Sequence, residues 1–126
     1  MILLKFFKPI MRQNFQKGEI INVDLGSPPK EVKGHEQGFD RPCIVIKSFP
    51  QLELVIVTPC TSKEPKYNHY TIVKLSKGSG GLITDSYALC HQIRTVSFER
   101  IKAKRGKLDS KDLLKIQTVL LDTLDI

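Results

Sequence analysis

The side chains best suited to chemistry gather in residues 34–42, just ahead of an apolar segment. His35, Glu36 and Gln37 supply an imidazole, a carboxylate and a carboxamide, and Arg41 adds a guanidinium shortly after them. Imidazole titrates near neutral pH and guanidinium stays charged, so this set could move protons and hold an anion. Glycines within this stretch let the backbone turn tightly, as in loops that carry functional sites. We therefore expect a functional site on this loop.

Two further polar groups lie at the ends of other apolar segments. Thr61 and Ser62 follow one such segment, and His91 lies between two short ones. Hydroxyls at strand ends often only cap the backbone, and a histidine between apolar strands is often a packed structural residue. For Arg41 the corresponding alternative is an ion pair with a neighbouring carboxylate. The residues alone leave each of these alternatives open.

The composition favours a nucleic-acid partner. The chain has 126 residues, which suits a single domain. Its 20 lysines and arginines against 13 acidic residues give a net charge of +7, and such a surplus attracts polyanions through counterion release. The alternative is a basic protein whose charge serves solubility alone.

Neither the cysteines nor the N-terminus indicates a secreted, metal-binding or membrane protein. Cys43, Cys60 and Cys90 have no close spacing and the three histidines are equally scattered, so we expect reduced, buried thiols in a cytoplasmic protein without metal or cofactor. Lysines interrupt the apolar start of the chain, which is too short to span a bilayer. We expect residues 1–16 to form an appendage and residues 17–126 to form the domain.

The elements that must position these side chains are mainly strands. Alternation of apolar and polar residues predicts a strand over 18–25. Two apolar segments rich in Val and Ile, 41–47 and 52–59, predict adjacent antiparallel central strands. The connection over 26–40 is long for a compact domain, at about fifteen residues, and such loops often bind ligands.

Shorter elements follow towards the C-terminus. Strands are predicted over 69–75 and within 86–97, either as one bent strand or as two, with a glycine-rich hairpin turn at 78–81. Residues 98–104 are predicted as a turn or short helix, in a basic run that is either a solvated face or a phosphate-contacting edge. Apolar residues at helical spacing predict an amphipathic helix over 109–124. The fold class is therefore mainly β, a small barrel of five to seven antiparallel strands with a C-terminal helix.

Several short motifs occur together in an order typical of one family. They are Gly18–Ile20, Val23–Leu25, His35–Gln37 with Arg41–Pro42, Pro59–Ser62 and Gln92–Val96, followed by the closing helix. With these motifs the chain resembles the MazF/PemK-type toxins over about residues 17–124. The resemblance implies an SH3-like barrel that forms a homodimer and cleaves single-stranded RNA without a metal ion. It also implies that the cleavage is sequence-specific and inhibits translation and growth. A cognate antitoxin is expected to inhibit this endoribonuclease.

The resemblance assigns roles to individual residues. Arg41 matches the arginine of the family's Arg-Pro motif and Thr61 matches its catalytic hydroxyl, while His35 and Glu36 match loop residues implicated in some members. Many members have an acidic residue where this chain has His91, which leaves open how the proton transfers are divided here.

Metal-free RNA cleavage needs a base for the 2′-hydroxyl, an acid for the leaving 5′-oxygen and a cation for the phosphorane, and it leaves 2′,3′-cyclic phosphate and 5′-hydroxyl ends. Arg41 suits the cation, and Thr61 could hydrogen bond the phosphate. Our hypothesis is that Glu36 or His35 is the base and that His91 assists as the acid.

Further residues are expected to bind the RNA. Aromatic rings stack on bases and basic residues line the groove in single-stranded RNA sites. The expected binding set is Gln37, Phe39, Ser62, Lys63, Tyr67, Gln92 and Arg94. An acidic antitoxin segment that folds across the same groove would explain inhibition.

Three other functions remain possible from the sequence. The first is a non-enzymatic toxin resembling CcdB, which binds a protein such as DNA gyrase. The second is a plain nucleic-acid-binding barrel, for which the net charge alone would suffice. The third is a metal-dependent nuclease, which the scattered histidines and carboxylates disfavour.

Overall fold

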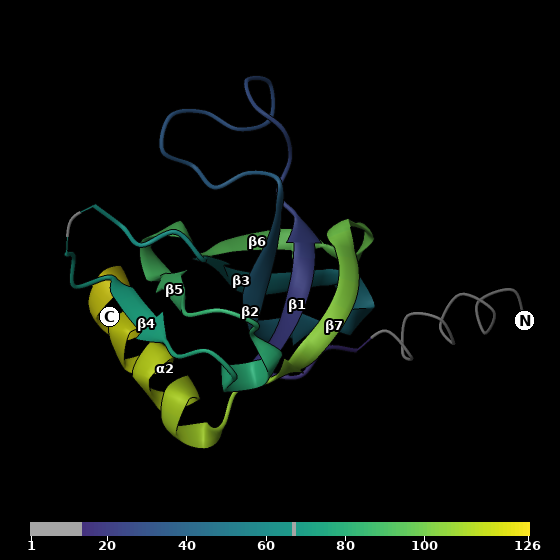
Figure 1. Ribbon diagram of the computed structural model, residues 1–126. Coiled ribbons are helices and arrows are strands. Elements are labelled where there is room, and N and C mark those ends of the chain that lie inside the picture. The colour runs from purple at the N-terminus through teal and green to yellow at the C-terminus, as the bar shows by residue number, and fades with distance from the viewer. Residues whose placement is uncertain (1–13, 67) are drawn as a thin grey trace, which may run out of the picture.

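The protein is mainly an antiparallel sheet followed by one helix, as a computed structural model shows for residues 14–66 and 68–126 (Figure 1). The strands are β1 (Glu19–Asp24), β2 (Asp40–Phe49), β3 (Leu54–Thr61), β4 (Ile72–Leu75), β5 (Ser86–Leu89), β6 (Arg94–Ser97) and β7 (Ile101–Lys107). Short 3₁₀ turns are η1 (Pro50–Leu52), η2 (Ser79–Gly81), η3 (Cys90–Gln92) and η4 (Phe98–Arg100), and the helix is α2 (Ser110–Leu124). The predicted fold class is confirmed.

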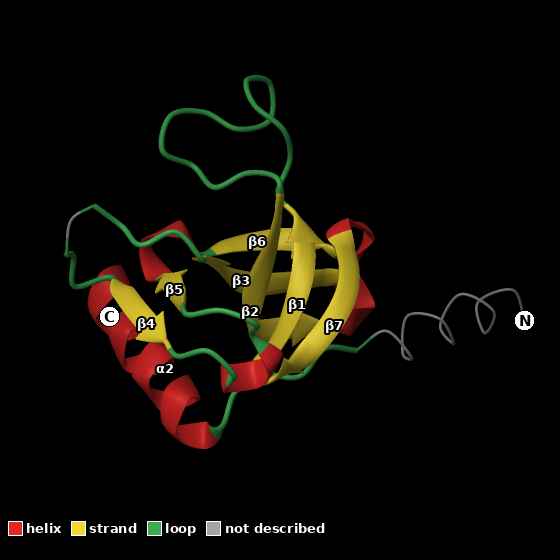
Figure 2. Cartoon of the chain, in the orientation of Figure 1, coloured by secondary structure: helices red, strands yellow, loops and turns green. Residues whose placement is uncertain are grey.

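Strand β3 is the centre of the sheet. β2 pairs antiparallel with one edge of β3, which confirms the two predicted central strands, and Cys43 lies opposite Pro59. On the other edge, β6 pairs with the first half of β3 and β5 with its last two residues. β1 and β7 continue the sheet beyond β2, and β4 lies beyond β5. The strands curl instead of forming a flat layer (Figure 2).

Side-chain alternation divides the interior into two apolar clusters. Ile44 of β2 belongs to the first cluster, whereas its neighbours Cys43 and Val45 belong to the second. The first cluster also contains Ile116 and Leu120 of α2, because the helix lies across β4 and η3 (Figure 1). Both faces of the central strands are therefore buried, which explains why these strands are continuously apolar.

Helix α2 begins and ends where the sequence predicts. The Asp109 carboxylate accepts the backbone N–H of Asp112 at 2.8 Å and so caps the first turn. Ile116 and Leu120 are buried under the sheet, and Leu114 on the outer face is 63% exposed. The periodicity of the apolar residues thus reports the face that packs against the core.

The downstream strands differ in part from their predictions. Of the segment 98–104, only η4 forms a turn, and the prediction is wrong from Ile101 onward because β7 pairs there with β1. Tertiary pairing outweighs local pattern in this basic segment, where Ile101 lies opposite Val23. The strand predicted over 69–75 begins only at Ile72, the 86–97 segment forms two strands, and 78–81 is confirmed as the turn between β4 and β5.

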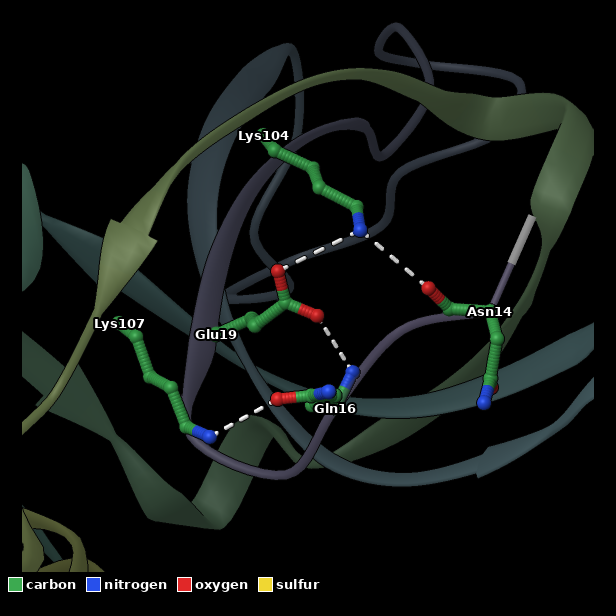
Figure 3. A network of polar contacts seen from close by, with 5 residues as sticks. All are labelled: Asn14, Gln16, Glu19, Lys104 and Lys107. Atoms are coloured by element: carbon green, nitrogen blue, oxygen red, sulfur yellow. Dashed lines mark hydrogen bonds and ion pairs between the residues drawn. The ribbon is translucent and has the colours of Figure 1, made fainter. Parts of the chain in front are cut away.

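Lysines of the basic strand β7 form hydrogen bonds with residues 14–16, at the start of the described chain. Lys107 donates from Nζ to Gln16 Oε1 at 2.9 Å, and Lys104 donates to the carbonyl of Asn14 at 3.3 Å (Figure 3). Lys104 also pairs with Glu19 of β1 at 3.5 Å. Two lysines of the basic run are therefore engaged within the molecule, while the role of the run as a phosphate-contacting edge stays a prediction.

Phe15 is part of the second apolar cluster. It is 8% exposed and meets Phe98 edge to face, with 4.9 Å between the ring centroids. Burial of this ring ties residues 14–16 to the sheet. The expected appendage falls largely on residues 1–13, which lie outside the described residues, so the domain boundary stays a prediction.

Removal of the buried helix side chain should destabilise the fold far more than removal of an exposed one. Ile116→Ala leaves a cavity under α2 and should lower the free energy of unfolding by about 2–5 kcal/mol. Leu114→Ala, two residues earlier and on the outer face, should change it by only about 0.5 kcal/mol. Urea denaturation of both variants measures the difference, and equal losses would contradict the described packing of α2.

Candidate functional site

The loop between β1 and β2 closes on a narrow neck. The N–H of Phe39 donates to the carbonyl of Gly26 at 2.7 Å, and the N–H of Leu25 donates to the carbonyl of Phe39 at 2.9 Å. Phe39 has a φ of 61°, a left-handed conformation that is rare for a bulky residue, and it is 58% exposed. The neck lets the loop project from the sheet (Figure 1) and presents an aromatic ring to solvent.

The polar end of this loop is attached to η3. Gln92 donates from Nε2 to the carbonyl of His35 at 2.9 Å. Within the loop, Glu36 Oε1 accepts the N–H of Lys33 at 2.7 Å and fixes the local turn. The Gln92 bond holds His35 beside η3, which carries His91 and is far away in the sequence.

Three adjoining hollows surround the loop and η3, and Gln37 lines all of them. The Thr61 pocket, of about 520 Å³, includes His35, Gln37, Thr61, Lys63, Lys66, His91 and Gln92. The Arg94 pocket, of about 480 Å³, includes Glu31, Glu36, Gln37, Pro59, His91, Gln92 and Arg94. The Arg41 pocket, of about 400 Å³, includes Lys33, Glu36, Gln37, Phe39 and Arg41. We call these three pockets together the groove.

A further hollow of about 550 Å³ lies elsewhere, between Asn14 and residues 47–52. Lys47 is its one titratable lining residue within the part of the chain that the structure describes. Apart from this lysine, it lacks the acid, base and anion-binding groups that line the groove.

The strand register explains why Arg41, Thr61 and Arg94 share one face of the sheet. Cys43 lies opposite Pro59 on β2 and β3, so Arg41 and Thr61, two positions further along each strand, share one face with that pair. Arg94 follows on β6, the next strand across. The polar groups thus extend the face that carries the second apolar cluster.

Arg41 is positioned by its own loop. Its Nε donates to the carbonyl of Gly38 at 3.0 Å, which orients the guanidinium along the Arg41 pocket. The ion pairs found within residues 14–66 and 68–126 do not involve Arg41, so the alternative of a structural salt bridge finds no support there. Arg41 does not line the Thr61 pocket, so the two residues share a face of the sheet but not a pocket.

The Thr61 hydroxyl has both a structural and a chemical capacity. Its Oγ1 accepts the N–H of Lys63 at 3.2 Å, so the capping alternative is confirmed. The hydroxyl hydrogen is not used in that bond and can be donated to an anion in the pocket.

His91 is the histidine whose environment is most changed. Partial burial, followed by the charge of His69, lowers the pKa of His91 below its ordinary value. His91 is therefore mainly neutral at pH 7 and accepts a proton more readily than it donates one. This direction disagrees with the acid role that we expect for His91 from the sequence.

Two residues that the sequence interpretation missed contact His91. Thr71 is 2% exposed, and its hydroxyl lies 2.7 Å from His91 Nδ1 and 2.8 Å from His69 Nδ1. From the sequence His69 is expected to be an ordinary surface residue. No local pattern reveals this contact, because it depends on how η3 packs beside β4.

The predicted RNA-binding residues divide into three groups. Gln37, Phe39, Lys63, Gln92 and Arg94 line the groove, Ser62 is exposed beside Thr61, and Tyr67 lies outside the described residues. Gln37 Oε1 is buried without a hydrogen-bond partner among the described residues, although other parts of the Gln37 side chain line all three pockets.

The three thiols are free and buried, as predicted. Burial raises the pKa of Cys43 to about 12 and that of Cys90 to about 11, and it raises the pKa of Cys60 as well. They remain protonated at neutral pH and are unsuited to nucleophilic catalysis.

The described residues show neither a metal cluster nor a membrane helix. Residues 14–66 and 68–126 contain no cluster of three or more His, Cys, Asp or Glu side chains placed to hold a metal ion. In the same ranges no helix has the length and apolar character needed to cross a membrane.

The chain is similar to known toxins. A model of the PemK-like, MazF-like toxin family of type II toxin-antitoxin systems matches residues 16–124. Endoribonuclease MazF of Staphylococcus saprophyticus is 32% identical over 108 residues, which cover 83% of this chain and 87% of that protein. The crystal structure of MazF from Deinococcus radiodurans has a TM-score of 0.71 at 20% identity, over 89% of this chain and 97% of that one. An endoribonuclease in complex with its cognate antitoxin, from a mycobacterial species, has a TM-score of 0.68 at 17% identity, over 90% and 97%.

Loss of the Gln92 amide should loosen the loop without unfolding the sheet. Gln92→Met keeps the side-chain length but removes the donor to His35, and loss of about 1 kcal/mol should speed amide exchange of residues 33–38 about five-fold. Hydrogen exchange followed by mass spectrometry measures this rate. Gln51→Met on η1 is the control and should leave it unchanged. Equal exchange in both variants would contradict the anchoring role of Gln92.

Proposed function

This chain belongs to the PemK-like, MazF-like toxin family of type II toxin-antitoxin systems, and from that premise we propose that it cuts single-stranded RNA at short specific sequences without a metal ion. It is a MazF-type endoribonuclease toxin of a toxin-antitoxin system. The observation that carries the proposal is the Thr61 pocket, where a hydroxyl, two imidazoles and lysines face one hollow. Such a set can bind a phosphodiester and move protons beside it.

The reaction uses the nucleophile that RNA itself contains. The 2′-oxygen bonds to phosphorus while its proton passes to a base, and the bond from phosphorus to the 5′-oxygen breaks. The electron pair of that bond remains on the 5′-oxygen, which takes a proton from an acid. The products are a 2′,3′-cyclic phosphate and a 5′-hydroxyl.

Two guanidinium groups and one hydroxyl along the groove bind the phosphates of the RNA. Arg41 and Arg94 lie on the same face of the sheet, and guanidinium groups grip phosphate oxygens in a bidentate manner. Thr61 donates its free hydroxyl hydrogen to a phosphate oxygen in the adjoining pocket. Preorganised donors of this kind supply a large part of catalysis because they need no rearrangement during the reaction.

The proton transfers are assigned by environment. His91 is the base, since its lowered pKa keeps the imidazole neutral at pH 7. His35 lines the same pocket and is the acid for the 5′-oxygen. Glu36 lines the neighbouring pockets and one of its oxygens is held by the Lys33 N–H, so it orients the loop instead. This division reverses the one expected from the sequence.

The rest of the groove binds the bases and the backbone of the RNA. The exposed Phe39 ring stacks on a base, Lys63 faces the phosphate backbone, and Gln37 lies where the three pockets adjoin and contacts the RNA there. The net charge of +7 strengthens binding and makes it sensitive to salt. Ser62, Gln92 and Tyr67 remain proposed members of this surface.

Two further partners are part of the proposal. The toxin forms a homodimer in the cytoplasm, and an acidic segment of a cognate antitoxin covers the groove and blocks RNA. The mycobacterial endoribonuclease solved with its antitoxin supports this by analogy. The family assignment favours this function over a gyrase-binding toxin or a plain nucleic-acid-binding barrel.

The decisive experiment is RNA cleavage in excess EDTA. Wild-type protein should cut single-stranded RNA and leave cyclic phosphate and 5′-hydroxyl ends, and it should not cut at a position with a 2′-deoxyribose. Arg41→Ala should slow cleavage about 10²- to 10³-fold because a preorganised cation is lost.

A second variant separates the role of Arg41 from the effect of net charge. Lys115→Ala removes one positive charge from the exposed side of α2 and should cut at the wild-type rate. Wild-type cleavage by Arg41→Ala would overturn the assignment of Arg41, and abolition of cleavage by EDTA would overturn the metal-free mechanism.

A further inference from the structure

A buried hydroxyl lies between two imidazoles beside the groove. Thr71 Oγ1 lies 2.8 Å from His69 Nδ1 and 2.7 Å from His91 Nδ1. The segments are also joined through the backbone, because the N–H of Cys90 donates to the carbonyl of Thr71 at 2.9 Å. With Thr71 only 2% exposed, solvent has little access to the hydroxyl, which must satisfy both histidines by itself.

The number of available hydrogens determines the direction of each bond. The Thr71 hydroxyl has one hydrogen and can donate to only one of the two rings. The backbone N–H of Thr71, which can only donate, also points at His69 Nδ1 at 3.4 Å. His69 Nδ1 is therefore an acceptor and takes the hydroxyl hydrogen. Thr71 Oγ1 must then accept from His91, so His91 has its proton on Nδ1.

We propose that Thr71 and His69 are positioning residues that hold His91 in the Nδ1–H tautomer, so that its unprotonated Nε2 is available in the Thr61 pocket as the base. This proposal rests on the proposed function and adds two residues to it. Nε2 takes the proton of the ribose 2′-hydroxyl as the 2′-oxygen bonds to phosphorus. The bond to the 5′-oxygen breaks with its electron pair, and that oxygen takes a proton from the His35 imidazolium.

The arrangement suits a base because it is the same before and after proton transfer. Neutral and protonated His91 both have a proton on Nδ1, so the bond to Thr71 persists when Nε2 is protonated. The opposite tautomer would require Thr71 to donate to His91, and His69 would lose its hydroxyl donor. No side chain therefore has to rotate during the step.

Several charged groups face His91 from the elements around it. They are His35, Glu31 and Glu36 of the loop after β1, Lys63, Glu64 and Lys66 after β3, Arg94 of β6, and His69 before β4. The net direction is set first by burial of the His91 ring, which lowers the pKa of His91. On the acid side of the pH profile, protonation of the His91 base should therefore reduce cleavage only below the ordinary histidine value of about 6.5.

Nitrogen-15 NMR tests the tautomer without reference to activity. Long-range correlations in the imidazole rings of the wild-type protein should show His91 protonated on Nδ1 and His69 protonated on Nε2. Thr71→Val should convert His91 to a mixture of tautomers, and Thr71→Ser should restore the wild-type spectrum. His91 protonated on Nε2 in the wild type would overturn the proposal.

A second variant keeps the test decisive if Thr71→Val does not fold. His69→Phe removes the acceptor of the hydroxyl hydrogen from an exposed position, so Thr71 could donate to either state of His91. The His91 tautomer should become mixed in this variant too. An unchanged spectrum would remove His69 from the proposal.

Cleavage kinetics test the consequence for catalysis. His91→Gln should lower kcat about 10²-fold or more, and Thr71→Val should lower it about 10-fold with KM unchanged, because only the base is affected. Thr71→Ser should recover the wild-type rate. The acid limb of the pH profile should shift in Thr71→Val but not in Thr71→Ser. Thr118→Val, on the exposed side of α2, is the matched control and should behave as wild type.

The outcomes separate this proposal from the proposed function. A wild-type protein that does not cut RNA would overturn both the function and the base step, while the spectrum would still decide whether Thr71 sets the tautomer. Normal cleavage by His91→Gln, together with the expected spectrum, would overturn the base role alone.

Discussion

Strand β3 must satisfy hydrogen bonds on both of its edges, and the rest of the structure follows from how it does so. β2 pairs along one edge, whereas the other edge is shared between β6 and β5. The change of partner falls between Val57 and Cys60, and the chain that passes from β5 to β6 forms η3 there. Pro59 lies at this point and has no N–H to leave unpaired. Because η3 carries His91 and Gln92, the division of one strand edge between two partners places these side chains beside the groove.

The sequence predicts the elements well where side-chain pattern and burial coincide. The apolar runs of β2 and β3 and the spacing of α2 are confirmed, because each element has a face or faces that must be buried. The prediction of a turn or helix is wrong for the second half of the 98–104 segment. The basic residues there show no apolar periodicity, and pairing with β1 makes β7 extended. Local sequence does not carry information on such pairing.

The site could be predicted only in part for the same reason. The loop residues, Thr61 and His91 are visible as polar groups beside apolar segments, and the resemblance to a toxin family joins them into one site. The role of Thr71 could not be predicted from the sequence, because it depends on two contacts of the Thr71 hydroxyl, one of them to His91 of η3. The pocket occupied by Arg41 also depends on a bond to Gly38 that no spacing rule implies.

The burial of Cys43 has a consequence for the electrostatics of the groove. The positive charges of Arg41 and Arg94 both act on this thiol, yet burial outweighs them and keeps it protonated. A thiolate at this position would neutralise part of the field that the two guanidinium groups create. Since the thiol stays neutral and is closed to solvent, the attraction of the groove for a polyanion does not depend on the redox state of the cell.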